Sequence, residues 1–411
     1  GPRSSGAPDS LPRAAMVRAS QNEQKAKPLE LGAQLMCRWR DNEVKPCEVL
    51  ERQQNEDTGD WEYYIHYEGM NRRMDEWVSL DRFDLGSVTD VAGKLTRTSK
   101  RKHEHEEHEE EGELDLATLK EHEEATKVKN VTRIQFGEWQ METWYFSPFP
   151  KEYQGVHMLY FCEFDLSFFA RKEQLERYLK TKCKRFHPPG DEIYREKDIS
   201  IFEVDPKVQR VYCENLCLLA KLFLDHKTLY YDVDPFLFYV LCEVGDDGGH
   251  RIAGYFSKEK FSSESNNIAC ILVLPQHQRK GYGKLIIDVS YQITIREGKV
   301  GSPEKPLSDL GQLSFRSYWT AVLLHTLSEH RGNLSIRDIS IMTAIKTEDI
   351  ISTLQSLNLI KYWKGQHVIA VSPKIVDEHL ARNARPSLRC EVDKLRWQPP
   401  PDENQPGSAA G

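Results

Sequence analysis

A glycine-rich turn near residue 281 has the composition of an anion-binding site. It follows an apolar run, residues 268–274, which ends at Pro275 and is typical of a buried strand. It precedes a helical stretch at residues 285–296. Gly281 and Gly283 permit backbone conformations and close approaches that a Cβ atom would forbid. Because the next amides lie at a predicted helix N-terminus, where unpaired N–H groups and the helix dipole favour an anion, the turn is predicted to cradle phosphate.

The spacing distinguishes this turn from two other phosphate-binding loops. It lacks the four residues between glycines and the G-K-S/T of a P-loop, and it lacks the first glycine of the dinucleotide fingerprint. A Q-x-x-G-x-G turn after a strand is similar to the pyrophosphate loop of acetyl-CoA-dependent N-acetyltransferases. On this stretch alone, a tight turn that packs against a sheet remains the alternative.

Longer stretches resemble the MYST family of histone acetyltransferases, in the subgroup with a chromo barrel. They are A-C-I-L-V-L-P-Q-H-Q-R-K-G-Y-G-K at 269–284, G-S-P-E-K-P-L-S-D-L-G at 301–311, S-F-R-S-Y-W at 314–319 and E-T-W-Y-F-S-P-F-P at 142–150. The resemblance implies an α+β protein: a small N-terminal β-barrel, then a mixed α/β acetyl-CoA-binding core. A degenerate zinc-finger module precedes the core, and a winged-helix-like flank follows it.

The implied reaction needs a base, and the resemblance assigns that role to Glu304. A lysine ammonium has a pKa near ~10.4, so roughly one in a thousand is a free amine at neutral pH. Glu304 lies on the loop after the cradle's helix, and partial burial would raise its pKa toward operating pH. Cys270 matches a family cysteine proposed to accept the acetyl group. Because a cysteine in an apolar strand is more often core, direct attack in a ternary complex is favoured, with Cys270 shaping the site.

The remaining site residues also come from the resemblance. Lys227 matches a lysine that the family acetylates on itself; spacing alone would make it a surface residue at a helix C-terminus. Ser308 would hydrogen-bond the departing sulfur. The predicted acetyl-CoA contacts are Ile271, Leu272, Val273, Gln278, Arg279, Lys280, Gly281, Tyr282, Gly283, Lys284, Ser308 and Ser317.

Residues 29–86 resemble a chromo barrel through Y-Y-I-H-Y-x-x-x-N-R-R-x-D-E-W. Strands are predicted at 34–38, 45–51, 61–67 and 76–79. Trp39, Tyr64, Tyr67 and Trp77 are candidates for a methyl-lysine cage, and the alternative is that they are core or rim aromatics. Arg72 and Arg73 offer a contact to nucleic-acid phosphate instead.

The finger module departs from the family's Cys, Cys, His, Cys ligand set. Cys162 and Cys183 are present, but Asp165 and Tyr178 stand where the second cysteine and the histidine belong. Cys162, Asp165, Cys183 and His187 offer four groups with workable spacing, although aspartate is an uncommon structural ligand. The prediction is that zinc is absent or weakly bound and that neighbouring phenylalanines pack in its place.

Composition sets broad limits. The 411 residues carry 39% hydrophobic residues and a net charge of −8, so the chain is globular and any nucleic-acid-binding surface is local. Nine cysteines without paired spacing indicate reduced, intracellular thiols. No apolar run approaches membrane-spanning length and no signal peptide is visible, so no membrane contact is expected. The chain begins Gly1-Pro2, which fits a fragment or a processed chain.

The predicted domain organisation is as follows: 1–28 disordered, 29–86 chromo barrel, 87–127 charged linker, 128–398 acetyltransferase domain and 399–411 disordered tail. The domain divides into a finger-like module at 130–190, a cofactor core at 191–311 and a helical flank at 312–398. Further strands are predicted at 131–136, 142–146, 199–204, 211–212, 236–243 and 252–256, with helices at 115–126 and 216–224. Two helices and a hairpin after residue 335 suggest a winged helix, which would either enter a major groove or wall the peptide groove; the second interpretation is favoured.

The sequence therefore predicts a nuclear lysine acetyltransferase that uses acetyl-CoA on histone tails, mainly histone four. Its partners would be nucleosomes and a multi-subunit complex. Two rivals remain: a chromatin-binding scaffold with weakened activity, motivated by the lost finger ligands, and an acetyltransferase for other amines.

Overall fold

The computed structural model describes residues 28–40, 42–55, 58–89, 126–225, 227, 232–330, 334–363, 366–369, 373–382 and 388–399. All but the last residue of the predicted helix at 115–126, most of the charged linker, nearly all of the N-terminal segment and most of the C-terminal tail lie outside these ranges. The described residues form two compact units. The first holds those up to Lys129 together with Trp144–Phe146, and the second holds the rest.

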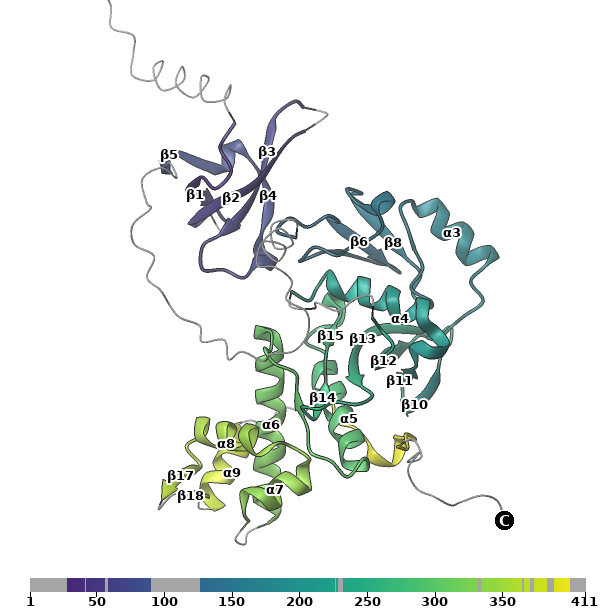
Figure 1. The fold of residues 1–411 in the computed structure, drawn as a ribbon, viewed down its shortest axis with the longest axis vertical. Helices are drawn as coiled ribbons and strands as arrows, with labels where there is room; N and C mark the ends of the chain where they lie inside the picture. The colour runs from purple at the N-terminus through teal and green to yellow at the C-terminus, as the bar shows by residue number, and fades with distance from the viewer. Residues whose placement is uncertain are drawn as a thin grey trace, which may run out of the picture. The chain divides into compact units, whose positions relative to one another are not determined.

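The first unit is a five-stranded antiparallel sheet in the order β4-β3-β2-β1-β5 (Figure 1). The strands are β1 (Gln34–Arg38), β2 (Val44–Gln54), β3 (Trp61–Tyr67), β4 (Glu76–Ser79) and β5 (Phe83–Thr89). Alternate residues of β3, Tyr63, Ile65 and Tyr67, enter the core of this unit. Strand β5 is not among the predicted strands, although its pairing with β1 extends the sheet.

Residues 142–146 do not form the predicted strand. Strand β7 (Trp139–Glu142) instead lies earlier, because Gly137, at φ 59°, makes a tight turn after β6 (Arg133–Phe136). The segment Trp144–Phe146 joins the first unit, where the Tyr145 hydroxyl donates to Asn71 Oδ1 at 2.7 Å. Arg73 lies over the Trp144 ring, 6.0 Å from its centroid.

The second unit begins with a small sheet in the order β7-β6-β8-β9, formed with β8 (Met158–Phe161) and β9 (Phe168–Phe169). Helix α3 (Lys172–Thr181) follows, and β7 packs beside the short 3-10 helix η5 (Pro275–His277).

The central sheet has the order β10-β11-β12-β13-β15. Its strands are β10 (Asp191–Glu196), β11 (Ile199–Val204), β12 (Phe236–Val244), β13 (His250–Glu259) and β15 (Ile271–Val273). Residues 211–212, predicted as a strand, lie inside helix α4 (Pro206–Lys221). The Asp205 side chain accepts from the Lys207 N–H at the start of α4 and Pro206 occupies its first turn, which is a strong helix start.

The apolar run 268–274 is two strands rather than one. Strand β14 (Asn266–Ile268) leaves the central sheet and pairs in parallel with β16 (Ser302–Pro303), whereas β15 stays against β13. Ser257 of β13 causes the break, because its backbone binds Ala269 and Cys270 and its hydroxyl accepts from the Cys270 N–H at 3.1 Å.

Two long helices, α5 (Tyr282–Arg296) and α6 (Asp309–Glu329), pack together and share one hydrophobic core with the central sheet (Figure 1). The flank adds α7 (Ile336–Thr343), α8 (Thr347–Ser356), β17 (Ile360–Trp363), β18 (Gln366–Ile369) and α9 (Pro373–Arg382). The turn between α7 and α8 is tied to Gly301, whose N–H donates to Ala344 and whose carbonyl accepts from Lys346. The flank therefore braces the loop that carries Glu304.

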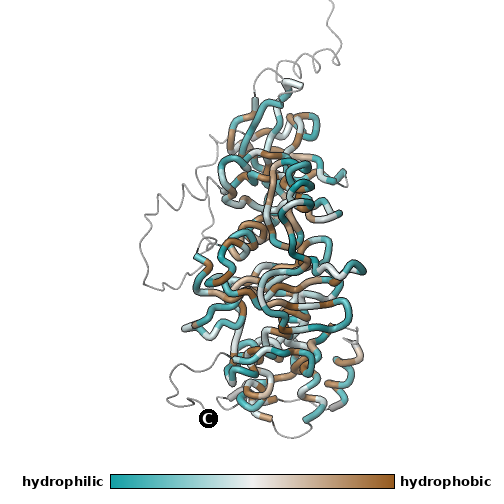
Figure 2. Tube along the Cα trace, turned by 90° about the vertical axis from the view of Figure 1, so that its right-hand side faces the viewer, coloured by the Kyte–Doolittle hydropathy of each residue, from teal (hydrophilic) through white to brown (hydrophobic). Residues whose placement is uncertain are grey.

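Hydrophobic and hydrophilic residues are interspersed along the strands and helices of the described chain (Figure 2). Among the described residues, no helix combines the length and the apolar character that a membrane crossing requires. The fold is the expected α+β arrangement: a strand-rich N-terminal unit, a small module, a mixed α/β core and a helical flank.

Candidate active site

The predicted phosphate cradle forms between β15 and α5. Strand β15 leads into η5, then Arg279 and Gly281 adopt left-handed φ values of 65° and 95°, and α5 begins at Tyr282. The Gln278 side chain donates to the Val273 carbonyl at 3.0 Å and braces the turn. The first N–H groups of α5 have no partner within the helix, so they are available to an anion.

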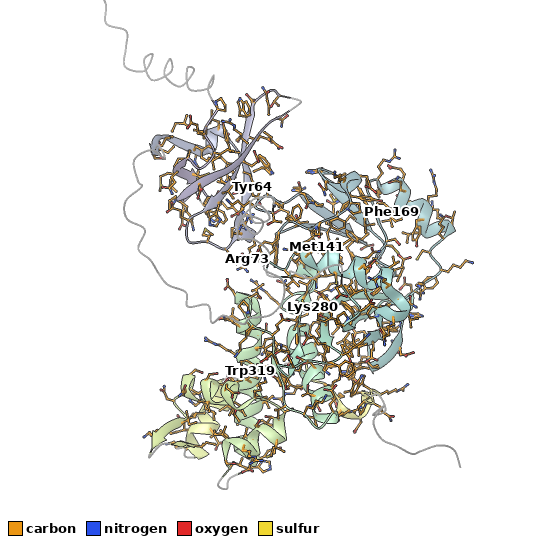
Figure 3. The ribbon with its side chains drawn as sticks, in the orientation of Figure 1. Tyr64, Arg73, Met141, Phe169, Lys280 and Trp319 are labelled. Carbon is orange, nitrogen blue, oxygen red and sulfur yellow. The ribbon has the colours of Figure 1, made fainter. Side chains whose placement is uncertain are left out.

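Glu243 of β12 anchors this turn, and sequence reasoning missed it. Its Oε1 accepts from Lys280 Nζ at 2.7 Å and from the Tyr282 hydroxyl at 2.5 Å, and it lies 3.1 Å from His277 Nδ1. Burial alone would raise the pKa of Glu243, but the bonds from Lys280 and Tyr282 outweigh it and lower that pKa. Lys280, labelled in Figure 3, therefore shares its charge with Glu243, whereas Arg279 is exposed and forms no ion pair with the described residues.

Strand β15 is the last strand in the order of the central sheet. It pairs with β13 through Gly254↔Val273, Tyr255↔Leu272 and Phe256↔Ile271. Leu272 is buried, and the other two residues of β15 are half-buried. The outer edge of β15 thus offers backbone groups to an extended ligand arm that ends at the cradle.

A cavity of about 170 Å³ lies at the start of β15. Three groups with reactive chemistry line it: the Glu304 carboxylate, the Cys270 thiol and the Lys227 amine. Cys217, Ser257, Glu259 and Ser308 line it as well. The structure thus brings together both predicted catalytic residues and the predicted self-acetylation site.

Glu304 is held by its backbone at the mouth of this cavity. Its N–H donates to the Ile268 carbonyl at 2.8 Å, directly after the β14–β16 pairing. Desolvation, followed by the carboxylate of Glu259, raises the pKa of Glu304 above the usual glutamate value, and Lys227 acts in the opposite direction. A raised pKa with continued solvent access suits a group that must take up and release a proton.

Lys227 is buried, contrary to its alternative assignment as a surface helix cap. Its Nζ donates to Cys270 Sγ at 3.6 Å, and α4 already ends at Lys221. Burial alone would lower the pKa of Lys227, but the sulfurs of Cys270 and Cys217 offset that effect and raise the pKa.

The two predicted serines lie on or beside α6. Ser308 caps the helix by accepting from the Gly311 N–H at 3.1 Å, and it lines the cavity. Ser317 is half-buried two turns further on and does not line the cavity. Ser314 of the same helix lies 3.8 Å from the position of a Cβ on Gly283. The start of α6 therefore packs beside the first turn of α5.

The four aromatic cage candidates separate into two pairs. Trp39 contacts Tyr67 with ring centroids 4.6 Å apart, and Tyr64 contacts Trp77 at 5.4 Å. Tyr67 belongs to the core of the unit, whereas Tyr64, three residues earlier on β3, points to the opposite face. The structure thus contradicts a single four-residue cage.

The predicted finger ligands come together only in part. The donor atoms of Cys162, Asp165 and Cys183 lie within 4.8 Å of one another. His187 does not join them, because its Nδ1 lies 2.7 Å from the Pro188 carbonyl and its ring stacks on Phe202 at 5.4 Å. The four-ligand set that included His187 is therefore wrong.

Comparisons with protein-family models and with curated proteins agree with this geometry. The MOZ/SAS family matches residues 187–396, the MYST family zinc finger domain matches 128–183, and an RNA binding activity-knot of a chromodomain matches 29–85. The histone acetyltransferase of the MYST family 1 from Arabidopsis thaliana is 56% identical over 384 residues, covering 90% of this chain and 86% of the relative. A putative MYST-like histone acetyltransferase of Oryza sativa subsp. japonica is 57% identical over 386 residues (90% and 85%). A histone acetyltransferase of Saccharomyces cerevisiae is 42% identical over 385 residues (82% and 86%).

Proposed function

The chain belongs to the MYST family of histone acetyltransferases, and from that premise we propose that it acetylates histone-tail lysines through the cavity at Glu304. Acetyl-CoA supplies the acetyl group as a thioester. The observation that carries the proposal is the convergence of Glu304, Cys270 and Lys227 on one cavity beside the free edge of β15.

The residues present suit acetyl-CoA. The edge of β15, at Ile271, Leu272 and Val273, would hold the extended pantetheine arm by backbone hydrogen bonds. The turn from Gln278 to Lys284 would hold the pyrophosphate at the N-terminus of α5, where Arg279 adds positive charge. Ser308 would lie near the thioester sulfur, and Ser317 further along α6 would contact the cofactor.

Glu304 is proposed as the general base. It would take a proton from the substrate ε-ammonium, so that the free amine attacks the thioester carbonyl. Burial and the neighbouring Glu259 carboxylate raise the pKa of Glu304, which makes its carboxylate a stronger base for this proton transfer.

Cys270 is proposed to shape the site rather than to carry the acetyl group. Its N–H is fixed by Ser257 and its sulfur accepts from Lys227. Lys227 is proposed as a self-acetylation site, supported by the burial of its amine in the cavity that Glu304 lines.

From the family we also propose that histone four is the main substrate, that the protein is nuclear and that it belongs to a multi-subunit complex. A nucleic-acid contact through Arg72 and Arg73 of the first unit is also proposed, supported by the match to the RNA binding activity-knot of a chromodomain.

Acetyl transfer to a histone-four tail peptide, with wild type beside Glu304→Gln from about pH 6 to about pH 9.5, tests the proposal. Wild-type kcat/KM should rise with pH through the raised pKa of Glu304, because the base acts as the carboxylate. The variant should lose roughly 100-fold or more at neutral pH and partly recover at high pH, where the substrate amine deprotonates unaided.

Two results would favour the rivals. Normal nucleosome binding without any turnover of bound acetyl-CoA would support the scaffold. Faster acetylation of free polyamines than of the peptide would support an acetyltransferase for other amines.

A further inference from the structure

A closed group of hydrogen bonds stands where the family's finger has two metal ligands. The Tyr178 hydroxyl donates to Asp165 Oδ2 at 2.6 Å and accepts from the Ser167 hydroxyl at 3.3 Å. The other carboxylate oxygen, Oδ1, accepts from the Ser167 N–H at 3.0 Å. Both oxygens of Asp165 therefore already have partners within the module.

This group joins the two segments that a finger metal would join. Asp165 and Ser167 lie in the turn between β8 and β9, whereas Tyr178 lies on α3. A structural zinc ion holds such segments through four protein ligands in a tetrahedron. Here a carboxylate accepts a phenol O–H directly, which is a short, charge-assisted bond.

The donor set does not fit a structural zinc site. Cys162 and Cys183 have sulfurs 3.6 Å apart and Asp165 is close to both, so the described part of the chain brings three donors together instead of four. The position of the fourth is taken by a phenol whose proton is committed to Asp165. His187 is held elsewhere by Pro188 and Phe202.

Aromatic packing completes the connection between the segments. Phe169 of β9, labelled in Figure 3, contacts the Tyr178 ring at 5.1 Å. Phe168 contacts Phe161 at 5.8 Å, Phe149 at 5.0 Å and Tyr153 at 4.9 Å. These ring contacts pack the turn after β8, strand β9 and helix α3 against one another.

We propose that the finger module of this chain is zinc-independent, and that the Asp165–Tyr178 hydrogen bond, braced by Ser167 and the aromatic cluster, replaces the metal. The module then keeps its fold in the presence of chelators, unlike a finger whose folding depends on bound zinc. This inference concerns the module's stability and does not depend on the proposed catalytic roles.

The first test is the metal content and chelator response of the full chain. The purified protein, expressed in zinc-supplemented medium, should contain well under one zinc per chain by atomic emission. Its melting temperature should not change when EDTA or a stronger zinc chelator is added. A zinc content near one per chain with a chelator-induced fall in melting temperature would overturn the proposal.

The second test isolates the hydrogen bond. Tyr178→Phe keeps the ring but removes the hydroxyl, so the melting temperature should fall by roughly 2 to 6 °C. Tyr160→Phe is the matched control, because it removes a hydroxyl from β8 of the same module and leaves the Asp165–Tyr178 bond in place. Equal melting temperatures for Tyr178→Phe and wild type would contradict the role given to this bond.

The third test reverses the two substitutions. The double variant Asp165→Cys, Tyr178→His offers three thiols and an imidazole, so it should bind about one zinc per chain and become sensitive to chelators. If it stays zinc-free, the assignment of the loss to these two positions is wrong. Zinc gain by the double variant, with a zinc-free wild type, would establish both parts of the inference.

Discussion

The two glycines of the cradle should fail in different ways when each is replaced by alanine. Gly281 has φ 95°, so Gly281→Ala forces a left-handed conformation that costs roughly 1–2 kcal/mol. That cost lowers the melting temperature by roughly 2–8 °C in a unit of this size. Gly283 has no positive φ, and a Cβ placed on it meets nothing closer than Ser314 Oγ at 3.8 Å. Gly283→Ala should therefore leave the free protein as stable as wild type or slightly more stable.

For the affinity for acetyl-CoA, Gly283→Ala is the substitution expected to have a direct effect. If the pyrophosphate approaches the backbone at Gly283, a methyl group on that residue prevents the phosphate oxygens from reaching one backbone N–H. One charge-assisted hydrogen bond is then lost. Such a bond contributes roughly 1.5–3 kcal/mol, which corresponds to about a tenfold to hundredfold loss of affinity for acetyl-CoA. Gly283→Ala should thus separate affinity from stability, because the methyl group obstructs only the bound state.

Calorimetric titration with acetyl-CoA and thermal melting without it provide the two readouts. Gly298→Ala is the matched control: Gly298 lies just beyond the other end of α5 at φ 67°, with nothing within 4 Å of the added Cβ. It should lower the melting temperature as Gly281→Ala does, yet bind acetyl-CoA normally. Unchanged affinity in Gly283→Ala would refute the position given to the pyrophosphate.

Two further substitutions test the assignments around the cavity and the turn. Cys270→Ala should retain kcat within about tenfold, since direct attack needs no thiol, and mass spectrometry of the wild type should show no acetylated cysteine. A fall in kcat of about a thousandfold or more in the variant would indicate an acyl-enzyme. Glu243→Ala should raise KM for acetyl-CoA several-fold with little change in kcat, because Glu243 holds Lys280 and Tyr282 but does not line the cavity. Glu243→Gln, which keeps an acceptor for Tyr282, should restore part of the KM, and a fall in kcat alone would contradict this positioning role.

Local signals were enough to predict much of the first unit. Strands β1, β3 and β4 have the predicted bounds, because aromatic and β-branched residues alternate there between clear turns. Helices α7 and α8 also form as predicted, separated by Ala344 at φ 58° and preceded by the Ser335 cap. In these segments local preference and tertiary packing favour the same conformation.

The failures occur where a distant residue decides the local structure. Nothing within residues 268–274 indicates that the run breaks at Cys270, because the break depends on Ser257 across the sheet. The departure of Trp144–Phe146 depends in the same way on Asn71 and Arg73, far earlier in the chain. The error at 211–212 is different, since Asp205 and Pro206 carried a local helix-start signal that two apolar residues obscured.

In the candidate site, the residues expected to contact ligands were predictable from local motifs, whereas the residues that hold them in place were not. The groups that would touch ligands, Glu304 and the glycine turn, lie in contiguous motifs and were predicted from sequence. Glu243, which orients the turn, is 37 residues from Lys280 and becomes visible only when β12 is placed beneath the cradle. The Asp165–Tyr178 bond is similar, because each residue alone reads as a lost ligand. Their 2.6 Å contact is the basis of the proposed compensation, so a degenerate motif should be judged by the contacts of its replacements before it is taken as a loss of structure.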